Sequence, residues 1–175
     1  MEGRTKQIIL ETERLVLRRM RIEDAAFMLA LLNSEGWLKY IGDRNVKNLQ
    51  EAENYLREKV LIGSSINGLG MLLVEQKEEE KAIGICGLVE RDGLEAHDIG
   101  FAFLSEFSGK GYALESAQPV LKFAKDQLKL PKVLAITIKE NVKSIQLLEK
   151  LGLAYVKTIR LPNDEEDLLL YEIQF

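Results

Sequence analysis

Apolar residues recur along this 175-residue chain with two different periods, and the order of those periods limits the folds that it can adopt. Alternating segments predict strands, whereas apolar residues spaced by three and four predict amphipathic helices. Strands are predicted at 13–21, 71–76, 82–91, 95–104, 132–138, 153–161 and 167–175, and helices at 22–36, 48–61, 111–130 and 141–152. This β-α-α-β-β-β-α-β-α-β-β order predicts an α/β fold in which helices flank a mixed, mostly antiparallel, twisted sheet.

The length of the chain corresponds to about one domain, and no repeat or low-complexity linker divides it. We therefore expect a single domain over residues 8–175. No apolar run approaches the roughly 20 residues that a membrane helix needs, and the segment MEGRTKQIIL lacks the apolar stretch of a signal peptide. These features predict a cytoplasmic protein without a membrane partner.

The composition also argues against several kinds of partner. A formal net charge of -4 does not favour a nucleic-acid surface, because neutralising phosphates requires clustered lysine and arginine. The single cysteine, Cys86, cannot form an internal disulfide, and the single histidine, His97, leaves no metal-binding cluster of the His/Cys type. Neither a metal nor a nucleic acid is therefore expected. Because the strand at 167–175 can pair with a second copy, the sequence leaves open a monomer or a homodimer.

Two glycines stand between the strand that ends near Leu104 and the helix that begins near Tyr112, in the segment FSGKGYALES. Exposed backbone N–H groups and the positive end of a helix can together bind an anion at such a junction. The segment is not a P-loop, and it lacks the third glycine of the dinucleotide-binding pattern because Leu114 occupies that position. A plain strand-to-helix turn also explains Gly109 and Gly111, so both interpretations stay open at this point.

The combination of motifs around this junction carries a family resemblance. The segment DIGFAFLSEFSGKGYALESA, followed by VLAITI and NVKSIQLLEKLGLAYVKT, resembles the GNAT superfamily of acetyl-CoA-dependent N-acetyltransferases. The opening segment ETERLVLRRMRIEDAAFMLALLN is similar to the branch that includes ribosomal-protein N-terminal acetyltransferases, so the likeness covers nearly the whole chain. It implies splayed central strands, acetyl-CoA as cosubstrate, and an amine acceptor that is either a protein N-terminus or a small molecule.

The resemblance also implies which residues contact the coenzyme. Its diphosphate is expected on the backbone amides of Gly109, Lys110, Gly111, Tyr112 and Ala113. Its pantetheine arm is expected to pair, like an added strand, with Ala102, Phe103 and Leu104. Asn141 and Ser144 match further coenzyme-contacting positions, although they also fit the N-cap and first turn of the helix at 141–152.

Two positions depart from the family pattern. Many members have Gln or Arg where this chain has Ser108, and much of the superfamily has a tyrosine general acid where this chain has Leu148. These departures keep an alternative open, in which the domain binds coenzyme A or a peptide without catalysing a reaction. A phosphate-binding domain for another nucleotide is a third hypothesis.

Acetyl transfer requires a group that accepts the proton of the attacking amine, because most alkylamines are protonated at neutral pH. Asp98 is the candidate general base, since it lies on a strand that leads to the proposed site, and Glu90 and His97 are weaker candidates. Cys86 is expected to pack as a small apolar residue, which argues against a covalent acetyl-cysteine route.

The acceptor site is expected to be walled by residues 33–48, between the first two predicted helices. Trp37 and Tyr40 in this segment either stack on an acceptor or fill the core. Tyr112 and Tyr40 are also possible proton donors, although a tyrosine with one polar end is as well suited to the edge of a core.

Overall fold

The computed structural model describes residues 6–62 and 69–175. The strands of the described residues are β1 (Ile8–Glu11), β2 (Leu15–Arg19), β3 (Met71–Gln76), β4 (Lys81–Val89), β5 (Asp98–Phe103), β6 (Lys132–Thr137), β7 (Ala154–Ile159) and β8 (Leu168–Gln174). The helices are α1 (Ala25–Leu32), α2 (Glu35–Tyr40), α3 (Leu49–Tyr55), α4 (Tyr112–Asp126) and α5 (Val142–Lys150). A π-helical segment, η2 (Leu56–Leu61), continues α3. The 3-10 turn η1 (Ile22–Asp24) precedes α1, and the 3-10 turn η3 (Ser105–Phe107) follows β5.

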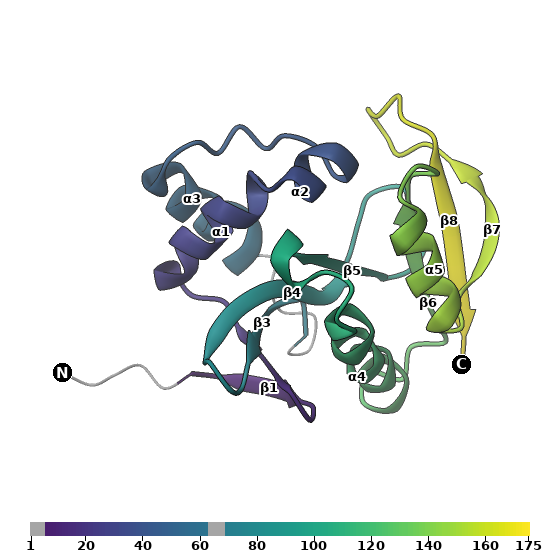
Figure 1. Ribbon diagram of the computed structural model, residues 1–175. Coiled ribbons are helices and arrows are strands. Elements are labelled where there is room, and N and C mark those ends of the chain that lie inside the picture. The colour runs from purple at the N-terminus through teal and green to yellow at the C-terminus, as the bar shows by residue number, and fades with distance from the viewer. Residues whose placement is uncertain (1–5, 63–68) are drawn as a thin grey trace.

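All the strands belong to one twisted sheet, whose order is β1-β2-β3-β4-β5-β6-β8-β7 (Figure 1). Every neighbouring pair in this order is antiparallel except β5 and β6, which are parallel. The mixed, mostly antiparallel α/β fold that the sequence predicts is therefore confirmed.

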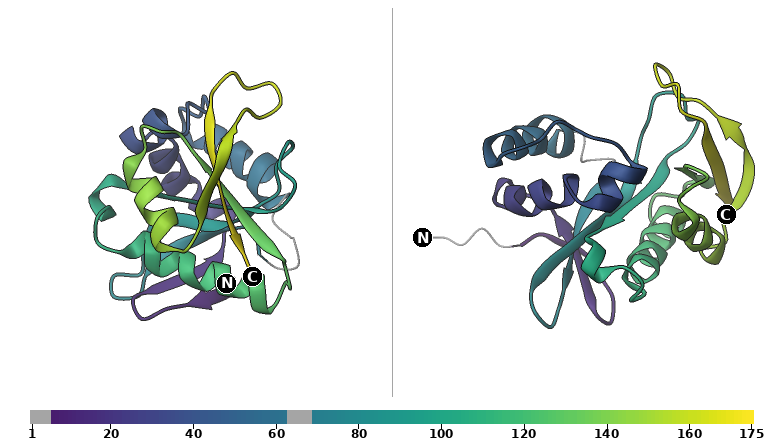
Figure 2. Two further views of the ribbon diagram at one scale, coloured as in Figure 1. Left: turned by 90° about the vertical axis from the view of Figure 1, so that its right-hand side faces the viewer. Right: turned by 45° about the horizontal axis from the view of Figure 1, so that its top comes forward.

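Helices cover both faces of the sheet. Figures 1 and 2 show α1, α2 and α3 gathered on one face and α4 and α5 on the other. The alternation of β3 divides its side chains between the two cores: Val74 packs on the α4 side, whereas Leu73 packs with α1 and α3. Helix α4 buries residues spaced by three and four, namely Ala117, Val120, Leu121 and Ala124.

A buried ion network ties the start of α1 to the sheet. Arg18 on β2 is only 3% exposed, and its guanidinium donates to both carboxylate oxygens of Asp24 at 2.7 and 2.9 Å. Its Nε donates to Glu75 on β3 at 2.7 Å. Since both carboxylates are also buried, the charges compensate one another in a region that excludes water.

Three details of the chain differ from the sequence prediction. The predicted helix at 22–36 is two helices, because α1 ends at Leu32 and Ser34 caps the N-terminus of α2, with its side-chain oxygen 3.4 Å from the N–H of Trp37. Gly36 therefore lies within α2 rather than after a helix. Strand β1, which no alternating pattern predicts, pairs with β2 across a short turn. Helix α4 continues through Pro119 and ends at Asp126, earlier than predicted.

Candidate functional site: the gap between β5 and β6

The sheet opens between β5 and β6. These two strands pair at one position, Asp98 with Leu134, where the N–H of Leu134 donates to the carbonyl oxygen of His97 at 2.9 Å. Beyond this point no pairing joins the described residues of the two strands, although each continues to pair with its other neighbour. The splayed central strands that the family resemblance implies are thus present.

The register of β5 decides which backbone groups face this gap. The N–H of Leu104 donates to the carbonyl of Ile83 at 3.0 Å, and hydrogen-bonding residues alternate along an antiparallel pair. Ala102 therefore directs its backbone groups at β4, whereas Phe101 and Phe103 direct theirs at the gap. The carbonyl of Leu104 is also occupied, because it accepts from Phe107 at 2.9 Å.

Of the three residues expected to pair with the pantetheine arm, Phe103 therefore has its backbone groups on the open side, and Ala102 and Leu104 do not. Phe101, which is not among the three residues that the resemblance implies, also has its backbone groups on the open side. The signal that identifies it is the alternation of the strand, because the backbone groups on one edge recur at every second residue.

The two glycines shape the junction between β5 and α4. Gly109 has a φ of 74° and Gly111, the N-cap of α4, has a φ of 83°. Both values lie in the left-handed region, where a side chain would be strained. The two glycines therefore form a strand-to-helix turn, and the loop that contains them is exposed.

This loop presents a continuous set of free donors. None of the backbone N–H groups of residues 109–114 donates a hydrogen bond to another described residue. The N–H of the next residue, Glu115, does donate a hydrogen bond, to the carbonyl of Gly111 at 3.0 Å. Because these N–H groups stand at the positive end of α4, they form an arrangement suited to a phosphate or diphosphate.

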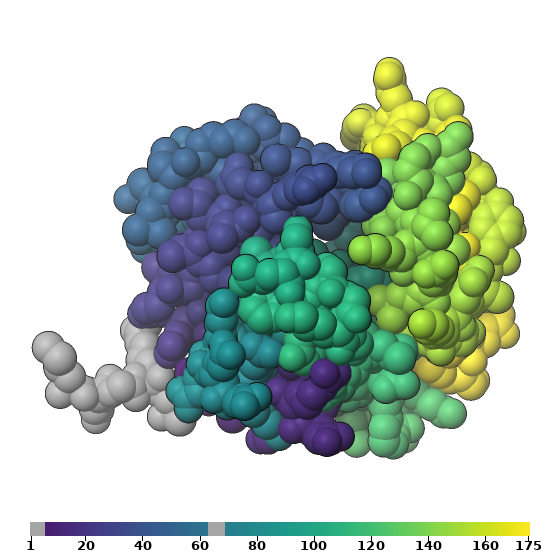
Figure 3. Space-filling model, viewed as in Figure 1, coloured from purple at the N-terminus to yellow at the C-terminus, as the bar shows by residue number. Residues whose placement is uncertain are grey.

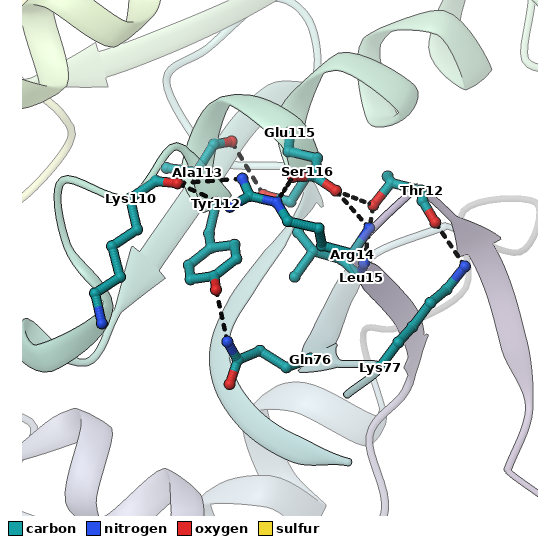
Figure 4. Close-up of polar contacts among 10 residues, drawn as sticks. All are labelled: Thr12, Arg14, Leu15, Gln76, Lys77, Lys110, Tyr112, Ala113, Glu115 and Ser116. Atoms are coloured by element: carbon teal, nitrogen blue, oxygen red, sulfur yellow. Dashed lines mark hydrogen bonds and ion pairs between the residues drawn. The ribbon is translucent and has the colours of Figure 1, made fainter. Parts of the chain in front are cut away.

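Side chains from the β1–β2 turn and from β3 contact the loop and the first turn of α4 (Figure 4). Arg14, in the turn between β1 and β2, donates to Glu115 and to the carbonyl of Lys110, and its guanidinium lies 4.4 Å from the centre of the Tyr112 ring. The Tyr112 hydroxyl accepts from Gln76 at 2.6 Å, and the residue is 9% exposed. The side chain of Tyr112 therefore belongs to the edge of the core rather than to an open proton-donor position.

Helix α5 begins directly beyond β6. The side-chain oxygen of Asn141 accepts from the N–H of Ser144 at 3.2 Å, so Asn141 is the N-cap of α5. Its amide NH₂ group has no acceptor among the described residues and stays available to a ligand. Figure 3 shows the surface hollowed between the green segment that leads into α4 and the lighter green α5. Leu148, at the position of the missing tyrosine, is 1% exposed and belongs to the core.

Asp98 lies where β5 and β6 begin to diverge. The residue is 1% exposed, and both of its carboxylate oxygens accept from Nε of Arg91 at 3.0 Å. Burial raises the pKa of Asp98 above its ordinary value, and the charge of Arg91 only partly offsets this effect. A carboxylate with a raised pKa binds a proton more readily than an exposed one. The neighbouring His97 has its Nε2 3.1 Å from a carboxylate oxygen of Glu90.

Two of the other candidates, Cys86 and Trp37, lie in the core. Cys86 is fully buried in the core on the α4 side, and burial raises the pKa of its thiol to about 12. A thiol with this pKa is not a nucleophile at neutral pH. Trp37 is 8% exposed and packs in the core with α1 and α3, while Tyr40 is partly exposed at the end of α2.

Three further observations concern the rest of the molecule. A surface cavity of about 430 Å³, lined by Lys122, Lys125, Lys150 and Phe175 among others, lies at the far end of α4 from the loop, and no predicted site residue lines it. No group of three or more His, Cys, Asp or Glu side chains in residues 6–62 and 69–175 is placed to hold a metal ion. Over the same residues, no helix is both long and apolar enough to cross a membrane.

Comparison with known protein families decides the assignment. Residues 14–154 match the model of the acetyltransferase (GNAT) domain. The chain belongs to the GNAT acetyltransferase family. GNAT enzymes take the acetyl group from acetyl-CoA, so the protein is an acetyl-CoA-dependent acyltransferase, as the sequence predicted.

Individual relatives are distant but cover most of the chain. The uncharacterized protein YkkB of Bacillus subtilis is 29% identical in an alignment of 164 positions that covers 91% of each chain. The uncharacterized N-acetyltransferase YoaA of the same organism is 26% identical, over 82% of this chain and 81% of the relative.

Solved structures show the same GNAT fold. An acetyltransferase from Agrobacterium tumefaciens superposes with a TM-score of 0.77 at 22% identity, over 99% of this chain and 100% of the other. A spermidine N-acetyltransferase from Vibrio cholerae, in complex with CoA and spermine, has a TM-score of 0.74 at 20% identity, over 93% and 96%. A ribosomal-protein alanine acetyltransferase from Vibrio fischeri has a TM-score of 0.73 at 19% identity, over 94% and 95%.

Proposed function

We propose that this enzyme transfers the acetyl group of acetyl-CoA to a primary amine by direct attack, in the gap between β5 and β6. The observation that carries the proposal is the run of N–H groups over residues 109–114 that have no acceptor within residues 6–62 and 69–175, beside the point where the sheet opens. The diphosphate binds the amides of residues 109–113, and the pantetheine arm runs along the open edge of β5. Asn141 and Ser144, at the start of α5, contact the coenzyme from the other side of the gap.

The chemistry needs two further features. The lone pair of a neutral amine attacks the thioester carbonyl, the C–S bond breaks, and coenzyme A leaves as the thiolate, which is then protonated. Backbone N–H groups on the open edge of β5 can stabilise the oxyanion that develops on the carbonyl. Asp98, whose pKa is raised by burial, is the proposed acceptor of the amine proton, directly or through water.

The acceptor is a protein N-terminus or a small-molecule amine. Ribosomal-protein N-termini come first among the acceptors to be tested, because the opening segment of the chain is similar to that branch of the family. Polyamines come second, since a spermidine acetyltransferase shares the fold. Fold alone does not select between them. A cytoplasmic location and a monomeric or homodimeric state stay predictions.

Two measurements test this function. Isothermal titration with acetyl-CoA should show saturable binding, and ATP should not compete; no heat at millimolar acetyl-CoA would remove the binding half of the proposal. Release of free thiol on a panel of N-terminal peptides and polyamines should then show turnover with one acceptor class. Saturable binding without turnover on any amine would favour the alternative, a catalytically inactive coenzyme A- or peptide-binding domain.

A further inference from the structure

Arg14 connects the β1–β2 turn to the loop that precedes α4 (Figure 4). Its Nε donates to a carboxylate oxygen of Glu115 at 2.7 Å, and its Nη1 and Nη2 both donate to the carbonyl oxygen of Lys110 at 3.1 Å. Glu115 is held in turn by the hydroxyl of Thr12 at 2.6 Å and the backbone N–H of Arg14 at 2.9 Å. The guanidinium is therefore fixed in position before it reaches the loop.

The contact with the Lys110 carbonyl also orients a donor. In a trans peptide the C=O of one residue and the N–H of the next point in opposite directions. Since the Lys110 carbonyl points at Arg14, the N–H of Gly111 points away from the β1–β2 turn. That N–H belongs to the set over residues 109–114 that has no acceptor among the described residues.

This peptide needs an external restraint. Gly111 has a φ of 83°, and glycine populates positive and negative φ about equally, so its own conformational preference does not keep the peptide in one orientation. Among the described residues other than its two chain neighbours, the one atom that a Cβ at Gly111 would meet within 4 Å is Nη2 of Arg14, at 3.4 Å. On the side facing the turn, the restraint thus comes from Arg14.

We infer that Arg14 is a positioning residue for the coenzyme: it holds the Lys110–Gly111 peptide so that the Gly111 N–H is directed at the diphosphate. The inference rests on the proposed function of the loop. Glu115 serves the same end, because it fixes Nε and leaves the two terminal nitrogens to bind one carbonyl. Lysine at position 14 would retain the positive charge but could not hold Glu115 and the Lys110 carbonyl in this fork.

The test compares Arg14→Ala, Arg14→Lys and the matched control Arg160→Ala. Arg160 forms an exposed Nε–carboxylate pair with Asp167 at 2.6 Å, in the connection between β7 and β8 and away from the loop. Titration with coenzyme A measures the Kd of each protein, and thermal unfolding measures its Tm. Steady-state kinetics separate the KM for acetyl-CoA from kcat, and hydrogen exchange reports the protection of the Gly111 amide by coenzyme A.

Arg14→Ala is expected to raise the Kd and the KM roughly tenfold, which corresponds to one charge-assisted hydrogen bond, with kcat at saturation unchanged. Coenzyme A should protect the Gly111 amide in the wild type and in Arg160→Ala, but not in Arg14→Ala. Arg14→Lys should resemble Arg14→Ala.

Two results would overturn the inference while leaving the proposed function intact: coenzyme binding by Arg14→Ala that equals the wild type, or full recovery in Arg14→Lys, which would show simple charge attraction. A wild-type protein that does not bind coenzyme A would instead refute the proposed function, and this inference with it.

Discussion

Nε of Arg91 lies 3.0 Å from both carboxylate oxygens of Asp98, at the point where β5 and β6 separate. The arrangement combines a buried carboxylate with a partner that is itself 37% exposed. The positive charge of Arg91 offsets only part of the effect of burial, so the pKa of Asp98 stays above its ordinary value. This pairing makes Asp98 the residue to test first for proton transfer.

Replacing Asp98 by Asn should lower kcat by about 100-fold or more, because a general base contributes this much, while leaving the Kd for coenzyme A unchanged. In the wild type, kcat should rise with pH through the raised pKa of Asp98, since only the ionised form accepts a proton, and this limb should disappear in Asp98→Asn. The measurements are pH profiles of thiol release and titration with coenzyme A.

Glu90→Gln is the control for this variant, because Glu90 is the weaker candidate and its side chain is 69% exposed. It should retain wild-type kcat. Equal kcat values for Asp98→Asn and the wild type would show that Asp98 has a structural role and is not the general base.

Replacing Gly111 by Ala should weaken coenzyme A binding roughly tenfold or more, because a residue with a Cβ shifts the peptide that carries one of the free donors. The matched control is Gly152→Ala, since Gly152 lies just after the C-cap of α5 with a φ of 92°, similar to the 83° of Gly111. Each variant should lose about 1–2 kcal/mol of unfolding free energy. Titration should show a changed Kd only for Gly111→Ala; an unaltered Kd would mean that the glycine serves the turn alone.

The stability contribution of Glu115 should depend on pH. Burial by itself would raise the pKa of Glu115, but hydrogen bonds from Thr12 and Arg14 outweigh this and lower it. A carboxyl group whose pKa is lowered in the folded state stabilises the protein at any pH above its pKa in the unfolded chain, which is near 4.5 for Glu115. This contribution is lost as the pH falls through the pKa of the folded state.

Urea unfolding of the wild type and Glu115→Gln should therefore show a difference of about 1 kcal/mol at pH 7, limited by solvent screening, that shrinks below about pH 4.5. Glu106→Gln, which removes an exposed pair with Lys81, should match the wild type at each pH. A difference in unfolding free energy that does not shrink as the pH falls below 4.5 would contradict the assignment.

Cys86 should not react with iodoacetamide in the native protein at pH 8, because burial raises the pKa of its thiol to about 12 and blocks access. The same protein unfolded in guanidinium should be alkylated at once. Cys86→Ala should retain activity and lose about 1–2 kcal/mol of unfolding free energy from the cavity. Loss of turnover in a folded Cys86→Ala protein would revive the covalent route.

Much of the fold follows from local patterns in the sequence. The long strands and helices, the glycine loop between β5 and α4, and the Asn141 cap of α5 were all predicted, because periodicity and capping depend on residues within one or two turns of each other. The family motifs extend over the same segments, so they indicated both the sheet and the cosubstrate before any packing was known.

Other features depend on residues that lie far apart in the chain. Strand β1 and helix α2 have four and six residues, too few for a period to be recognised, and each is stabilised by its neighbours in the fold. Arg14 and Glu115 are 101 positions apart, and only the placement of the β1–β2 turn beside α4 brings them together. Likewise, the choice of Phe101 and Phe103 over Ala102 depends on the register between β5 and β4, because pairing between strands determines which edge each backbone group faces.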